Sequence, residues 1–156
     1  MSTTKPIVIL VAEDDPDDRL LMREAFEESR LANELHFVED GEELLDYLNK
    51  RNAYADQNAP YPGLILLDLN MPRKDGREAL AEIKESPELR RIPVVVMTTS
   101  KAEEDILRTY DLGVSSFIVK PITFDGLIRV MQALGRYWFE IVELPPEYQP
   151  ISGVAQ

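Results

Sequence analysis

The chain has 156 residues, of which 44% are hydrophobic, so it is long and apolar enough for one domain with its own core. A net charge of −12 disfavours nucleic acid and anionic membranes as partners, and no apolar run reaches the roughly 18 residues of a membrane-spanning helix. Because cysteine is absent and the N-terminus lacks a signal-peptide pattern, disulfides and thiolate metal sites are excluded and a cytoplasmic location is expected.

Apolar, β-rich runs alternate along the chain with helical patterns. In chain order, they predict a strand at 7–12, a helix from Pro16, a strand at 35–38, a helix at 41–50, a polar loop at 51–63, a strand at 64–67, a helix at 77–85, a strand at 94–97, a helix at 102–112, a strand at 116–119 and a helix at 124–139. The first run is continuous and β-branched, which is typical of a strand buried on both faces of a parallel sheet. In the first helix, the spacing predicts a buried face made of Leu21, Met22, Ala25 and Phe26.

This alternation of strands and helices predicts an α/β fold. Parallel strands that are joined by right-handed crossovers bring helices to both faces of one sheet. We therefore expect a doubly wound, five-stranded (βα)5 sheet with the flavodoxin-like strand order 2-1-3-4-5. The expected domain covers residues 1–140, and residues 141–156 form a C-terminal extension that is too short for an output domain.

Polar residues follow four of the expected strands. The carboxyl ends of parallel strands meet at one edge of the sheet, where the ligands of such folds bind. The residues placed there are Glu13, Asp14 and Asp15 after the first strand, Asp68 after the third, Thr98, Thr99 and Ser100 after the fourth, and Lys120 after the fifth. Although these groups are scattered in the sequence, we expect them to converge on one site.

The expected site combines several carboxylates with one lysine. Carboxylates that share a cleft stay ionised only if a cation joins them. With no cysteine and one histidine, the chain favours a hard cation such as Mg²⁺ or Mn²⁺ over a soft metal. A metal ion, the Lys120 ammonium and the Thr98 hydroxyl around one carboxylate would suit a transferring phosphoryl group. In this interpretation Asp68 is the nucleophile, and it forms an acyl phosphate.

Each of these residues also has a simpler explanation. An aspartate after a strand is often the N-cap of the next helix, and Asp15 and Asp17 are expected to be of this kind. Thr98 alone could be an ordinary strand residue, and Lys120 alone a solvated charge. It is the joint placement at four strand ends that favours a functional site. His36 has no second histidine with which to share a metal or a catalytic dyad, so it is expected to be structural or on the surface.

Four segments carry a resemblance to a known family. They are VAEDDPDD (11–18), ILLDLNMPRKDG (65–76), VVVMTTS (94–100) and SFIVKP (116–121). Together, and in this order, they resemble the receiver domain of bacterial two-component response regulators, over roughly residues 5–140. The resemblance implies a switch in a phosphorelay, rather than an enzyme. Such a switch accepts a phosphoryl group from a histidine kinase and then changes its protein-interaction surface.

The resemblance also implies roles for the acidic residues. Asp68 is similar to the phospho-acceptor of the family. Asp14 resembles a direct ligand of Mg²⁺, and Glu13 resembles the neighbouring acidic residue, which acts through water. The family often has aspartate in place of Glu13. The backbone carbonyl of Asn70 would complete the metal ligands that the chain supplies.

A second group of residues resembles the switch of the family. Thr98 is similar to the hydroxyl that moves when the acceptor is phosphorylated. Phe117 stands where the family has an aromatic ring, often tyrosine, that changes its rotamer in response. Lys120 resembles the lysine of the active site, and its bond to Pro121 looks like the family's cis peptide.

Two apolar features remain outside the expected core. Leu20 lies beside the buried face of the first helix, where it could receive a helical hairpin of the kinase. Near the end of the chain, apolar residues continue through Tyr137, Phe139 and Ile141, which predicts a homodimer through the last helix and tail. The tail at 137–146 is also similar to stand-alone receivers that serve phytochrome-type sensor kinases.

Two other functions fit part of the pattern. A hydrolase of the haloacid-dehalogenase type also forms an aspartyl phosphate. That class needs a second aspartate two residues after its nucleophile, however, and this chain has Asn70 there. A degenerate receiver that acts only as a binding module would have lost Asp68, Asp14 or Lys120, and all three are present.

Overall fold

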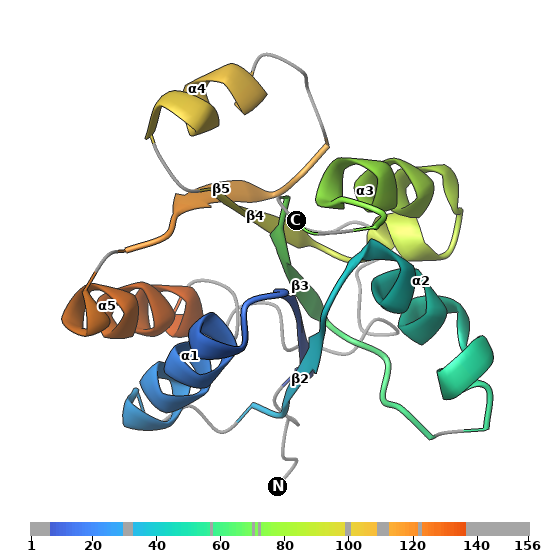
Figure 1. Ribbon diagram of the computed structural model, residues 1–156, viewed down its shortest axis with the longest axis horizontal. Coiled ribbons are helices and arrows are strands. Elements are labelled where there is room, and N and C mark those ends of the chain that lie inside the picture. The colour runs from blue at the N-terminus through green and yellow to red at the C-terminus, as the bar shows by residue number, and fades with distance from the viewer. Residues whose placement is uncertain are drawn as a thin grey trace, which may run out of the picture.

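A five-stranded parallel sheet forms the centre of the molecule (Figure 1). The computed structural model describes residues 7–29, 33–56, 58–69, 71, 73–98, 101–108, 113–121 and 123–136. The strands are β1 (Ile9–Ala12), β2 (Leu35–Val38), β3 (Leu64–Asp68), β4 (Val94–Thr98) and β5 (Ser116–Val119). Their order in the sheet is β2-β1-β3-β4-β5 and every adjacent pair is parallel, which confirms the predicted topology.

The apolar runs of the sequence occupy the three central strands. Every residue of β1, β3 and β4 is buried, because helices cover both faces of the sheet. All of β5 and most of β2 are only partly buried, since each of these strands has a neighbour on one side. Burial on both faces explains why the central strands are continuously hydrophobic in sequence.

The helices begin at polar caps close to the strand ends. They are α1 (Pro16–Glu28), α2 (Gly41–Asn49), α3 (Gly76–Glu85), α4 (Lys101–Arg108) and α5 (Phe124–Leu134), with two short 3₁₀ segments, η1 (Asn52–Tyr54) and η2 (Leu89–Arg91). The side chains that accept a backbone N–H at the start of a helix are those of Asp15, Asp40, Asp75 and Thr123. These bonds satisfy donors that the first turn leaves unpaired, and so they fix where each helix begins.

A hydrophobic core lies on each face of the sheet. Helices α1 and α5 pack together on one face, α2 and α3 pack on the other, and α4 contacts β4 and β5 (Figure 1). The core under α1 and α5 includes Val11, Leu66, Met97, Met22, Phe26 and Met131. The core under α2 and α3 includes Leu10, Ile65, Val96, Leu44, Leu80 and Ile83. Successive strand residues thus alternate between the two cores, as the pleat of a strand requires.

Some predicted boundaries are wrong. The first strand begins at Ile9 rather than at residue 7, and Asp68 and Thr98 end their strands rather than follow them. The loop predicted at 51–63 contains η1. These differences arise because backbone pairing, and not hydrophobicity, decides where a strand ends.

Helix α1 differs from its predicted pattern in one residue. Leu21 was expected in the core but is 40% exposed, because Met22, Ala25 and Phe26 alone fill the buried face. Asp15 caps the helix as predicted, whereas the prediction for Asp17 is wrong: its backbone N–H donates to the Asp15 side chain at 2.9 Å.

The described part of α5 ends at Leu134, followed by residues 135–136 in a π-helical turn, so the predicted extension to residue 139 lies outside the described residues. The same holds for the end predicted for the fourth helix at residues 109–112. None of the described helices has the length and apolar character that crossing a membrane requires.

Candidate functional site

The carboxyl edge of the sheet brings the predicted site residues together. Glu13 directly follows β1, Asp68 ends β3, Thr98 ends β4 and Lys120 directly follows β5. Glu13 and Thr98 are each 1% exposed, and Asp68 is 4% exposed. Four side chains that are far apart in the sequence therefore share one edge, as predicted, and three of them are almost fully withdrawn from solvent.

The Lys120 ammonium is the positive charge of this edge. Its Nζ lies 2.6 Å from Glu13 Oε1, 3.1 Å from Asp68 Oδ2 and 3.2 Å from Asp18 Oδ2. The lysine backbone is also held, because Lys120 N donates to the Thr98 carbonyl at 2.8 Å. One ammonium thus forms ion pairs with three carboxylates, which share its positive charge.

The cis bond implied between Lys120 and Pro121 is wrong. The peptide bonds of the described residues include none in the cis form. The trans form is the lower in energy for most residues before proline, by about 0.5–1 kcal/mol.

Three carboxylates of the site could hold a metal ion. Glu13, Asp14 and Asp68 each offer an oxygen, and these oxygens all lie within 4.8 Å of one another. The buried Glu13 Oε1 lies 2.6 Å from Lys120 Nζ, in an ion pair. A hard divalent cation takes oxygen ligands, so it could bind to these three carboxylates. The residues present therefore fit Mg²⁺ or Mn²⁺. Asn70, whose carbonyl was predicted to join them, lies outside the described residues.

The burial of the site changes the acid–base properties of two residues. Burial raises the pKa of Glu13 from 4.5 to about 7; the ion pair with Lys120 opposes this rise, and the charge of Asp68 adds to it. The pKa of Lys120 is raised even though burial opposes its charge, because Glu13 and Asp68 favour the ammonium form. The lysine therefore stays charged, and a second cation would relieve the remaining repulsion between the carboxylates.

The predicted switch residues lie on adjacent strands. Thr98 Oγ1 donates to the backbone carbonyl of Ile118, with a long distance of 3.4 Å. Phe117 precedes that residue on β5, is partly buried, and packs against the core under α2 and α3. A movement of the Thr98 hydroxyl toward Asp68 would therefore break a contact with β5 next to the Phe117 ring.

Hydrogen bonds and an ion pair connect the loop that follows Asp68 to the start of α2. Arg73 donates from Nε to Asp40 Oδ2 at 2.8 Å, and its Nη2 lies 2.6 Å from the same buried oxygen. Gly41 N donates to the Lys74 carbonyl at 2.8 Å. A Cβ at Gly41 would lie 2.2 Å from that carbonyl oxygen, so only glycine allows the two segments to come so close. These contacts hold the loop beside the acceptor in one position.

Two residues of α1 contact the site without having been singled out from the sequence. Asp18 pairs with Lys120, and Arg19 Nη1 donates to the carbonyls of Glu13 at 2.8 Å and Asp14 at 3.0 Å. The sequence could have indicated part of this, because a helix that begins at Pro16 places residue 18 in its first turn, close to Asp14. The contact of Asp18 with Lys120, however, joins residues 102 positions apart and depends on the fold.

The remaining predicted residues are away from this edge. Leu20 is 56% exposed on α1, as predicted. His36 lies at the surface, where its Nε2 is 2.6 Å from Glu34 Oε2, which agrees with the structural or surface role expected for it. Tyr137, Phe139 and Ile141 lie outside the described residues.

Comparisons with known proteins agree with this arrangement. Residues 9–132 match the family model described as the response regulator receiver domain. The chain is 44% identical over 140 residues to Response regulator Rcp1 of Synechocystis sp.. That alignment covers 90% of this chain and 94% of Rcp1, so the two proteins match over almost their whole lengths.

Two solved structures share both the fold and much of the sequence. The crystal structure of the Mn²⁺-bound form of Rcp1 matches with a TM-score of 0.77 at 44% identity, covering 90% of this chain and 99% of that one. The crystal structure of the phosphorylated cyanobacterial phytochrome response regulator RcpA matches with a TM-score of 0.76 at 44% identity, covering 86% of this chain and 94% of that one.

Proposed function

This chain belongs to the response regulator receiver domain family, and from that premise we propose that Asp68 is its phosphoryl acceptor. A receiver takes its phosphoryl group from a histidine kinase, so the chain acts as an acceptor in two-component signalling and not as an enzyme on a separate substrate. One observation carries the choice of Asp68. Its Oδ2 lies 3.1 Å from the Lys120 ammonium, beside the two other carboxylates of the group that could hold a metal ion.

We expect Asp14 and Asp68 to bind a divalent cation, Mg²⁺ or Mn²⁺, with Glu13 next to it. The relative Rcp1 has been solved in a Mn²⁺-bound form, which supports a cation at the matching edge of this chain. A bound cation would neutralise charge on the oxygens of the transferring phosphoryl group.

The transfer uses residues that are already in place. A carboxylate oxygen of Asp68 attacks the phosphorus of the kinase's phosphohistidine. The new P–O bond forms as the P–N bond breaks, and the bonding electron pair returns to the imidazole nitrogen. Because the Lys120 ammonium already lies beside Asp68 Oδ2, it can donate to the phosphoryl oxygens with little rearrangement.

Intact-mass spectrometry tests this function. The purified chain is incubated with acetyl phosphate in Mg²⁺ buffer, and we expect it to gain one phosphoryl group. The same incubation in excess EDTA should give no gain. A chain that stays unmodified in Mg²⁺, while a known receiver in the same tube is phosphorylated, would contradict the proposal.

Phosphorylation is expected to act through Thr98 and Phe117. An anion on Asp68 offers acceptors to the Thr98 hydroxyl, whose present bond to Ile118 is long and easily exchanged. Thr98→Ala should still accept one phosphoryl group but lose most of the change at Phe117. Fluorine NMR of a ring-labelled Phe117 would follow that change, and equal shifts in the variant and the parent would show that this route is wrong.

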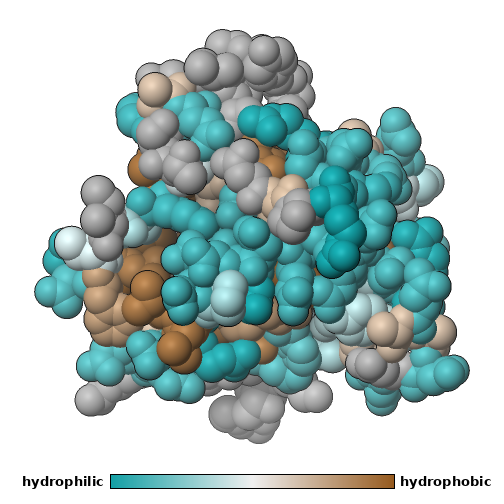
Figure 2. Space-filling view, viewed as in Figure 1, coloured by the Kyte–Doolittle hydropathy of each residue, from teal (hydrophilic) through white to brown (hydrophobic). Residues whose placement is uncertain are grey.

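We expect the kinase to bind at α1. Figure 2 shows an apolar area where α1 and α5 lie together in Figure 1, and Leu20, Leu21 and Phe124 are exposed large hydrophobic residues of these helices. The area borders Lys120, so a partner bound there would be next to the acceptor.

Leu20→Asp should slow phosphotransfer from the kinase by about tenfold while uptake from acetyl phosphate stays unchanged, since a charge is costly in an apolar interface. Tyr61→Asp is a matched control, because Tyr61 is 54% exposed but belongs to the loop before β3. An equal effect of both variants, or a loss with acetyl phosphate, would argue against docking at Leu20.

Three further features belong to this proposal. The likeness to RcpA, a phytochrome response regulator, supports a phytochrome-type sensor kinase as the donor.

The cysteine-free composition suits the cytoplasm, which cell fractionation can check. A homodimer through the last helix and tail rests on the apolar character of Tyr137, Phe139 and Ile141 in the sequence.

Sedimentation at micromolar concentration tests the dimer. The parent chain should sediment as a dimer, and Phe139→Asp should shift it toward the monomer, because a charge at an apolar interface is costly. Divalent cation binding should be unchanged in the variant. A parent chain that is monomeric both before and after phosphorylation would rule the dimer out.

A further inference from the structure

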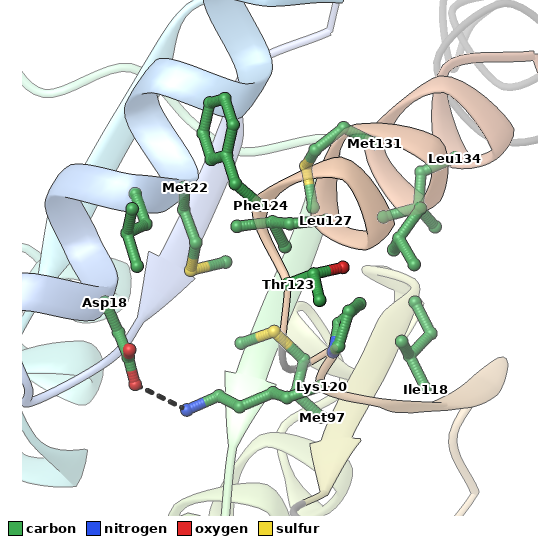
Figure 3. A pocket seen from close by; sticks show the side chains of 13 residues that line it. Asp18, Met22, Met97, Ile118, Lys120, Thr123, Phe124, Leu127, Met131 and Leu134 are labelled. Carbon is green, nitrogen blue, oxygen red and sulfur yellow. Dashed lines mark hydrogen bonds and ion pairs between the residues drawn. The ribbon is translucent and has the colours of Figure 1, made fainter.

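The side chain of Arg19 reaches back from α1 to the backbone of the acidic pair. Its Nη1 donates to the carbonyl of Glu13 at 2.8 Å and to the carbonyl of Asp14 at 3.0 Å. The neighbouring Asp18 lies 3.2 Å from Lys120 Nζ, at the edge of a cavity between α1 and α5 (Figure 3). The first turn of α1 is therefore joined to the site by two side chains, and the proposed function assigns no role to Arg19.

The two acidic residues differ in how firmly they are held. The backbone N–H of Glu13 donates to the Val38 carbonyl at 2.9 Å, and its side chain lies 2.6 Å from Lys120 Nζ. Asp14 is only partly buried, and its described hydrogen bond is the one that its carbonyl accepts from Arg19. The position of Asp14 therefore depends on Arg19 more than the position of Glu13 does.

Charge repulsion acts against this position of Asp14. The oxygens that Glu13, Asp14 and Asp68 offer to a metal ion lie within 4.8 Å of one another, so the ionised carboxylates repel when no cation joins them. Asp14 is the least buried of the three, and it can relieve the repulsion by turning toward solvent. A guanidinium bound to its carbonyl opposes that movement, because it fixes the backbone that carries the carboxylate.

We infer that Arg19 is a positioning residue for the metal site, which holds Asp14 where its carboxylate can bind a divalent cation. The inference rests on the proposed metal site of Glu13, Asp14 and Asp68. A site that is already formed binds more tightly than one whose ligands must first be gathered. Contacts behind metal ligands contribute about ten- to a hundredfold in affinity.

The charge of Arg19 has the opposite effect on affinity. A guanidinium close to a cation site repels the cation, so its removal would tighten binding if charge alone mattered. The Arg19 side chain is 22% exposed and its Nη2 lies 3.9 Å from Glu39 Oε2, so its charge is partly screened. We therefore expect repulsion to change the affinity by no more than about threefold. Positioning and charge thus predict changes of opposite sign when Arg19 is removed.

Titration calorimetry of the metal-free chain with MnCl₂ separates the two effects. Arg19→Met removes the donors and the charge but keeps an unbranched, apolar side chain. Arg23→Met is the matched control, because Arg23 is an exposed residue one turn further along α1, where its guanidinium lies 4.9 Å from the centre of the Phe37 ring. The Kd for Mn²⁺ should rise by about tenfold in Arg19→Met and change by less than about twofold in Arg23→Met.

Phosphoryl uptake from acetyl phosphate gives a second measurement. The Mg²⁺ concentration that supports half of the maximal rate should rise by about tenfold in Arg19→Met. At saturating Mg²⁺ the rate should stay within about twofold of the parent's, because the described contacts of Arg19 do not include Asp68 or Lys120. A general defect in the site would lower the rate at every Mg²⁺ concentration.

A double variant tests whether Arg19 acts through Asp14. In an Asp14→Asn background, Arg19→Met should weaken Mn²⁺ binding by less than about threefold, because the carboxylate that Arg19 positions is gone. A full tenfold loss in that background would overturn the inference. If urea unfolding shows that Arg19→Met does not fold, Arg19→Gln is compared with Arg23→Gln in the same way.

The remaining contrary results also have distinct meanings. Mn²⁺ affinity that is unchanged or tighter in Arg19→Met, an equal loss in Arg23→Met, or a much lower rate at saturating Mg²⁺ would overturn the role of Arg19. Each of these results would leave the metal site itself in place. A parent chain that binds no Mn²⁺ would instead contradict the proposed metal site.

Discussion

Asp68→Asn is expected to abolish phosphoryl uptake from acetyl phosphate in Mg²⁺ buffer. Asparagine keeps the size and shape of the side chain, and its carbonyl can still accept from Lys120. The amide oxygen is a much weaker nucleophile than a carboxylate, so no acyl phosphate should form. Intact mass should show the full gain of one phosphoryl group in the parent chain and none in the variant.

The control for this variant lies in the loop after β3. Asp75 is partly buried and caps α3, a role that asparagine also fills, so Asp75→Asn should be phosphorylated like the parent. Uptake of a full phosphoryl group by Asp68→Asn would remove Asp68 from the acceptor role. Peptide mapping of the phosphorylated parent would then have to identify a different residue.

The fold could be predicted because its central strands are buried on both faces. Burial of this kind leaves continuous apolar runs, such as 64–67, and the alternation of these runs with helical patterns fixes a parallel sheet. The site could be predicted for a related reason. Once the runs were assigned as parallel strands, Asp68, Thr98 and Lys120 had to lie at the same edge.

The contacts of the site that could not be predicted all depend on how helices and loops pack. Asp18 and Asp17 are identical residues in one turn, and only the packing of α1 decides that Asp18 faces Lys120. Leu21 fitted a buried pattern, but the face that α1 turns to the sheet excludes it. The pairing of Arg73 with Asp40 likewise joins two loops whose sequences carry no sign of each other.

Glu13 is expected to make the stability of the metal-free chain depend on pH. Its pKa is raised to about 7 in the folded chain, mainly by burial, from the 4.5 that applies when it is exposed. The folded state therefore binds the proton more tightly than the unfolded state does. This group's contribution is fully present below about pH 4.5 and is lost as the pH rises through about 7. This shift of the Glu13 pKa corresponds to roughly 3 kcal/mol in the free energy of unfolding.

Urea unfolding in EDTA at pH 4.5, 6 and 8 would measure this effect. Other carboxylates also titrate in this range, so the quantity of interest is the difference in unfolding free energy between the parent and Glu13→Gln. Glutamine keeps the shape and does not titrate. We expect the parent to lose roughly 3 kcal/mol relative to Glu13→Gln between pH 4.5 and 8. Parallel stability curves for the two chains would show that Glu13 does not hold a proton near neutral pH.

Divalent cation should remove the same pH dependence. A cation beside Glu13 favours the carboxylate form, so the pKa of Glu13 should fall in its presence and the proton should no longer be needed for stability. At pH 8 and a Mg²⁺ concentration of 100 times Kd, the gain in unfolding free energy should be about 2.7 kcal/mol. The gain should be smaller at pH 4.5, where the proton and the metal compete for one carboxylate. A gain from Mg²⁺ that is equal at both pH values would place the cation away from Glu13.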